Sequence, residues 1–105
     1  MTTKISQDAA NAFHNNKSFK RGSTEVRVFP LKDGHVTKLF LHGNVIAMQD
    51  NTGLFKVTLS GWGTQTTRDR LNALNGVKAC QRAHQQYIND VPVDENEIVV
   101  ISKGK

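Results

Sequence analysis

Residues 35–49, HVTKLFLHGNVIAMQ, decide the fold that this sequence predicts. Two stretches rich in β-branched and apolar residues, His35–His42 and Asn44–Gln49, are typical of β-strands. Gly43 and Asn44 can adopt the positive φ angles that a tight hairpin turn requires. The stretch therefore predicts two neighbouring antiparallel strands.

Three further strands are predicted on either side of this hairpin. Glu25–Phe29 alternates in polarity and precedes an Asp33-Gly34 turn signal, and Leu54–Ser60 follows a turn at residues 50–53. Short turns between successive strands favour an antiparallel meander. Glu97–Ser102 is apolar and is expected to return to the same sheet.

An N-terminal helix is predicted over Ser6–His14. Ser6 is a good N-cap, and Asp8 would lie in the first turn, where the helix dipole favours a negative charge. Ala9, Ala12 and Phe13 would form its apolar stripe. The polar segment Asn15–Thr24 is predicted to be a loop.

Helical structure is also predicted between the meander and the last strand. Thr66–Asp69 matches a capping box, with a hydroxyl residue three positions before a carboxylate. A helix would run from there through Leu74, and Val77–Asn89 has a second helical period. Because Gly76 can either end a helix or be tolerated inside one, residues 66–89 predict one kinked helix or two.

These elements predict an α+β fold, an antiparallel β-meander of four to five strands with helices packed on one face. The 105 residues fit a single domain over residues 1–105. Cys80 is the one cysteine, so no intramolecular disulfide can form, and no signal peptide or membrane span is readable. We therefore expect a cytoplasmic protein that does not contact a membrane.

The sequence contains no recognisable catalytic constellation. No nucleophile–base pair, phosphate-binding glycine loop or paired-carboxylate pattern is present, so we expect a protein that is not an enzyme and uses no cofactor. Cys80 and His84 would lie one turn apart on the predicted helix, but two ligands do not make a structural zinc site. Core packing is the favoured interpretation of both, and no metal is expected.

Charge makes nucleic acid the leading partner. The chain has 14 Lys and Arg against 9 Asp and Glu, a net charge of +5, and basic domains attract polyanions. Period-two alternation would put Arg27, Phe29, Lys38, Phe40 and Lys56 on one sheet face, a mixture that resembles a single-strand binding platform. The alternative is that a helix covers this face, with the phenyl rings in the core and the lysines reaching solvent.

A larger set of residues is predicted to bind nucleic acid through phosphate contacts or stacking: Lys20, Arg21, Arg27, Lys38, Arg68, Arg70 and Trp62. Two of these positions have a structural alternative. Trp62 is interpreted first as an apolar plug beneath the helix start and second as a stacking residue. Arg68 and Arg70 flank a helix N-terminus that could attract an anion, although simple capping is the default interpretation.

Four segments, 9–13, 18–26, 41–47 and 59–74, resemble a group of small bacteriophage proteins. The most specific part is the run from Trp62 to Leu74. No activity is assigned to that group, so the resemblance implies origin and compartment, a protein made inside an infected bacterium, and transfers no functional residue.

Three functions follow from these features. The first is a non-enzymatic protein that binds nucleic acid through a basic surface, and the second is an inhibitor that binds an acidic surface of a host enzyme or defence complex. The third is a homo-oligomeric virion component, in which Ile98–Ile101 would pair between subunits. The sequence does not specify the target or the oligomeric state.

Overall fold

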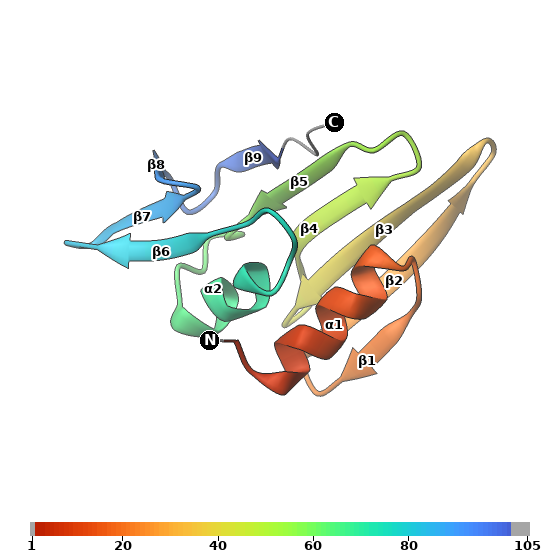
Figure 1. Ribbon diagram of the computed structural model, residues 1–105, viewed down its shortest axis with the longest axis horizontal. Helices are drawn as coiled ribbons and strands as arrows, with labels where there is room; N and C mark the ends of the chain where they lie inside the picture. Colours follow the sequence, from red (N-terminus) through yellow and green to blue (C-terminus); the bar gives the residue numbers. More distant parts are fainter. Residues whose placement is uncertain (1, 102–105) are drawn as a thin grey trace.

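The computed structural model describes residues 2–101 and contains two helices and two antiparallel sheets in that range (Figure 1). The elements in chain order are α1 (Lys4–His14), β1 (Phe19–Arg21), β2 (Thr24–Leu31), β3 (Gly34–Leu41), β4 (Asn44–Asp50), β5 (Phe55–Thr58), α2 (Gln65–Asn72), β6 (Ala79–Arg82), β7 (Gln85–Ile88), β8 (Val91–Val93) and β9 (Ile98–Ile101). The larger sheet has the order β1-β2-β3-β4-β5-β9, and the smaller has the order β6-β7-β8. The α+β class and the antiparallel meander are thus confirmed, but the sheet is larger than predicted.

Alternation along the strands divides the six-stranded sheet into two faces. The inner face is defined by a buried row in which Val26, Leu39, Ala47 and Val57 are register partners. Helix α1 packs on this face, with its Phe13 ring 5.7 Å from that of Phe55. In Figure 1, α1 crosses in front of β2 and β3. Helix α2 contacts α1, β4 and β6.

One irregularity interrupts the alternation. The register between β3 and β4 shifts at Leu39 and Phe40, so that Ile46 is an extra residue in β4. Ile46 and Ala47 are consecutive and both are buried. Such a bulge bends its strand and increases the local twist.

Polar side chains on the inner face fix the end of α1. The carbonyl of Phe13 belongs to the last helical turn, whose carbonyls lack intrahelical partners. The buried Gln49 Nε2 donates to it at 2.8 Å, and Thr37 Oγ1 donates to Asn16 Oδ1 at 2.7 Å. The last turn of α1 is therefore hydrogen-bonded to β4, and the loop that follows the helix is hydrogen-bonded to β3.

The predicted helix starts are displaced by a few residues. Thr3, rather than Ser6, is the N-cap of α1, and Ser6 is buried inside the helix. Asp8 is accordingly not in the first turn. Thr64, rather than Thr66, caps α2 by accepting a hydrogen bond from the Thr67 N–H.

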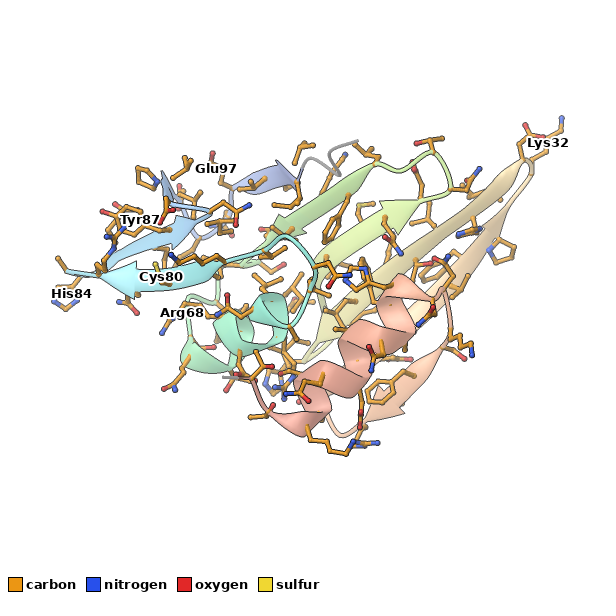
Figure 2. All side chains as sticks on the ribbon, viewed as in Figure 1. Lys32, Arg68, Cys80, His84, Tyr87 and Glu97 are labelled. Atoms are coloured by element: carbon orange, nitrogen blue, oxygen red, sulfur yellow. The ribbon has the colours of Figure 1, made fainter. Side chains whose placement is uncertain are left out.

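The predicted loop over Asn15–Thr24 contains a strand, because Phe19, Lys20 and Arg21 of β1 pair with β2. The helical prediction for Val77–Asn89 is wrong. This segment is the β6–β7 hairpin, which turns at Ala83 and His84 with φ angles of 50° and 67°. Figure 2 shows His84 at the tip of that hairpin and Cys80 along β6, so the two do not share a helix face. The last strand spans Ile98–Ile101, and Ser102 lies outside the described residues.

Asp69 and Arg70 join α2 to α1 and β2. Asp69 Oδ2 accepts hydrogen bonds from the Thr3 N–H at 3.1 Å and from Ser6 Oγ at 2.5 Å. Arg70 donates to Ser6 Oγ at 2.7 Å and through Nε to Thr24 Oγ1 at 2.8 Å. Burial raises the pKa of Asp69, but these hydrogen bonds and Arg70 outweigh it and leave the pKa below the ordinary value of 3.8.

We expect Asp69→Ala to lower the free energy of unfolding by about 1–3 kcal/mol, because its loss leaves partly buried donors unpaired. Chemical denaturation measures this change. The exposed Asp94 supplies the control, and Asp94→Ala should change the free energy by less than about 0.5 kcal/mol. Equal effects of the two substitutions would contradict the assigned role.

The same carboxylate should make stability depend on pH. Because the folded-state pKa of Asp69 is lowered, its contribution is complete above the unfolded value near 3.8 and is lost as the pH falls through the folded-state value. The difference in unfolding free energy between wild type and Asp69→Ala should therefore shrink on acidification. Denaturation series at neutral and acidic pH test this, and a constant difference would refute it.

Candidate nucleic-acid interface

The face of the six-stranded sheet opposite α1 is called the outer face here. Its residues are the register partners that alternate with the inner rows: Lys20, Glu25, Arg27, Phe29, Val36, Lys38, Phe40, Val45, Met48, Asp50, Lys56, Thr58, Ile98 and Val100. All are exposed or partly exposed, and Ile98 and Val100 are each 62% exposed. Phe29 and Phe40 are therefore not sealed in the core beneath a helix.

One row of the outer face runs straight across the strands. Arg27, Lys38, Met48 and Lys56 are successive register partners on β2, β3, β4 and β5. Since neighbouring strands lie about 4.8 Å apart, the row extends roughly 14 Å from Arg27 to Lys56. It supplies three cationic side chains in a line perpendicular to the strands.

Two phenyl rings pack against these cations. The Lys38 ammonium lies 5.2 Å from the centroid of the Phe29 ring, and the Arg27 guanidinium lies 5.0 Å from that of Phe40. The two rings are 6.5 Å apart. Cation–π contacts at such exposed sites stabilise by about 0.5–1 kcal/mol each, so they hold the cluster in place without neutralising the positive charge.

The charges in this row are not equally available. Arg27 donates two hydrogen bonds to Glu25, at 2.8 and 3.3 Å, and these hold the pKa of Glu25 below its ordinary value. Lys38 and Lys56 form no ion pair with any acidic group in residues 2–101. Lys20 lies on the same face opposite Glu25 and also lowers the pKa of that carboxyl. Lys38 and Lys56 therefore carry the charge in the row that no ion pair offsets.

Of the seven residues predicted from sequence, the structure brings three together on the outer face: Lys20, Arg27 and Lys38. Arg21 faces α1 instead and pairs with Asp8 at 2.9 Å. Arg70 has only 11% of its side chain exposed, because it joins α2 to Ser6 and Thr24. This burial also lowers the pKa of the Arg70 guanidinium below its ordinary value.

Arg68 also makes internal contacts. Its guanidinium donates to the Gly63 carbonyl at 2.8 Å and to Gln86 Oε1 at 3.1 Å, which ties α2 to β7. Figure 2 shows Arg68 on α2 near the smaller sheet. Neither Arg68 nor Arg70 therefore extends the outer-face row.

Trp62 does not plug the helix start. It is 58% exposed and lines a hollow of about 250 Å³, called here the Trp62 hollow, together with Leu41, His42, Asn44 and Ile46. Its apolar floor and partly exposed indole resemble a site that accepts a side chain or ring from a partner.

A second hollow of about 490 Å³ lies on the outer face itself. We call it the outer-face hollow, and its lining includes Val45, Met48, Lys56, Thr58, Asn96 and Ile98. The sequence offered no signal for it, because it combines three strands with a loop residue that is distant in the chain. Asn44 lines both hollows.

Within residues 2–101, no group of three or more His, Cys, Asp or Glu side chains is placed to hold a metal ion. Neither described helix has the length and apolar character needed to cross a membrane.

Trp62 is the one tryptophan, so fluorescence excited selectively at tryptophan reports on the Trp62 hollow alone. We expect emission typical of a solvated indole and efficient quenching by acrylamide, because more than half of the side chain is exposed. A blue-shifted spectrum that resists quenching would show that the indole is buried.

A family model described as Kyanoviridae Gp96 protein matches residues 2–103. No curated protein and no solved structure matches the chain.

Proposed function

The chain belongs to the Kyanoviridae Gp96 protein family, a bacteriophage family, and on that premise we propose that it is a binding protein that acts without catalysis in the cytoplasm of the infected cell. Its ligand is single-stranded nucleic acid, held on the outer face. The observation that carries this proposal is the open row of cations, flanked by two partly exposed phenyl rings.

Single strands suit this surface better than a duplex does. Proteins that bind single strands without strong sequence preference combine cationic side chains for the phosphates with aromatic rings on which bases stack. The outer face supplies both within a few ångströms, because Lys38 contacts the Phe29 ring. A duplex would hide its bases and could use only the lysines.

Salt dependence gives the sharpest test. Each phosphate contact with a single strand contributes about 0.7 to the slope of log affinity against log salt, so three contacts predict a slope near −2. We expect Lys38→Gln and Lys56→Gln each to weaken binding of a labelled oligonucleotide and to reduce the slope by about 0.7. Fluorescence anisotropy at several salt concentrations measures both quantities.

The control is Lys78→Gln, which removes the same formal charge just before β6, where Lys78 is 71% exposed and lies 3.8 Å from the equally exposed Asp90. It should leave the slope unchanged, although net charge falls equally. No binding of any oligonucleotide at low salt would reject the proposed function, and equal effects of all three substitutions would reject the outer face as its site.

The exposed Trp62 favours a second candidate, an inhibitor that binds a host protein. Tryptophan is enriched among the residues that dominate protein interfaces, and here it lines a hollow with an apolar floor. In this case Trp62→Ala should abolish capture of one specific partner from nuclease-treated host lysate, whereas Lys38→Gln should not. Loss of every partner after nuclease treatment would favour nucleic acid instead.

A further inference from the structure

The outer-face hollow lies where the cationic row ends. Lys56 is the last cation of that row and also lines the hollow. A strand of nucleic acid that follows the row from Arg27 toward β5 therefore arrives at the hollow with a phosphate close to Lys56. No other charged side chain of the described chain lines it.

The lining combines an apolar floor with a polar rim. Val45, Met48 and Ile98 supply aliphatic and thioether surface, and all three alternate onto the outer face. Ser60 Oγ donates to the Val45 carbonyl, and Thr58 Oγ1 accepts from the Ser60 N–H at 3.1 Å, so this wall is fixed by its own hydrogen bonds. Its volume is about 490 Å³, and it is an open depression in the sheet surface rather than an enclosed cavity.

Asn96 supplies the rim group that can recognise a ligand. Its side chain lies against Gly61, where an added Cβ would be 3.0 Å from Oδ1. In the described part of the chain, its carboxamide has no hydrogen-bond partner, unlike that of Asn72, which both donates to and accepts from the backbone of Ala79. The exposed amide therefore lies beside the hollow with its donor and acceptor free of partners within the described residues.

We infer that the outer-face hollow binds a purine base of a single strand, adenine above all, with Asn96 on the base edge and Lys56 on the adjacent phosphate. The inference rests on the proposed function. An asparagine carboxamide pairs in bidentate fashion with adenine, donating to N7 and accepting from the N6 amino group. The apolar floor supports the base plane, because every base has a π-face that packs on such a surface.

The test uses the full chain and two labelled oligonucleotides, oligo(dT) and the same oligomer with one central adenine. A bidentate contact predicts that the adenine raises affinity about fivefold or more. Asn96→Ala should remove this gain while leaving the affinity for oligo(dT) and its salt slope unchanged. The matched control is Asn75→Ala, an exposed asparagine elsewhere, which should retain the gain.

If the central adenine does not raise the affinity, or if the rise survives Asn96→Ala, the inference is overturned while the proposed function stands. A separate titration with adenosine monophosphate, followed by NMR, tests the hollow and Lys56 without Arg27 and Lys38 of the cationic row. Shifts at Asn96 and Ile98 without any oligonucleotide binding would support the hollow and reject the proposed function. Absence of shifts and of binding would reject both.

Discussion

The alternation of side chains in the six-stranded sheet is the constraint on which the rest of the structure depends. Once Phe55 and Val57 face the core, period two forces Lys56 and its register partners to the opposite side. The chain therefore cannot bury its core without also presenting a continuous outer face. The bulge at Ile46 is the one departure within the described strands, and it places two consecutive side chains in the core at the end of the sheet nearest Trp62.

The basic residues fall into two groups, those that make contacts within the fold and those that are exposed on the outer face. Arg68 and Arg70 hydrogen-bond between elements, and Arg21 pairs with α1, so these guanidinium groups stabilise the fold. The lysines of the outer face form no such contacts. Arginine suits the internal positions because its planar fork makes several directed hydrogen bonds at once, whereas a lysine remains a hydrated point charge. Net charge alone thus overstates the surface that a polyanion can contact.

The meander was predictable from sequence because its turns are short and rich in Gly, Asn and Asp. In addition, alternation along a strand assigns Lys38 and Leu39 to opposite faces of the sheet, whatever the rest of the fold is. The β6–β7 hairpin was not, since Val77, Cys80, His84 and Tyr87 also fit a helical period. Its turn uses Ala83 and His84 at positive φ, a conformation that is uncommon for residues other than glycine and especially so for alanine, and that strand pairing must impose.

The candidate site shows the same division between local and long-range information. Arg27, Lys38 and the two phenyl rings share a face because of alternation within single strands, so the sequence placed them correctly. The outer-face hollow depends on β9 returning to pair with β5 and on the loop that carries Asn96 to Gly61. No local pattern encodes those contacts.

Asn44 lines both hollows, so a ligand that used the two together would have to pass the end of the sheet at this residue. In the proposed function, a flexible strand that follows the cationic row reaches the outer-face hollow, and it would have to bend around the end of the sheet at Asn44 to reach the Trp62 hollow, whose lining includes the core residues Leu41 and Ile46. A rigid duplex could touch the lysines but would have to open before a base entered either hollow, which costs unstacking and unpairing energy. If the proposed function holds, the arrangement of charge and hollows suits a ligand whose bases are already unpaired.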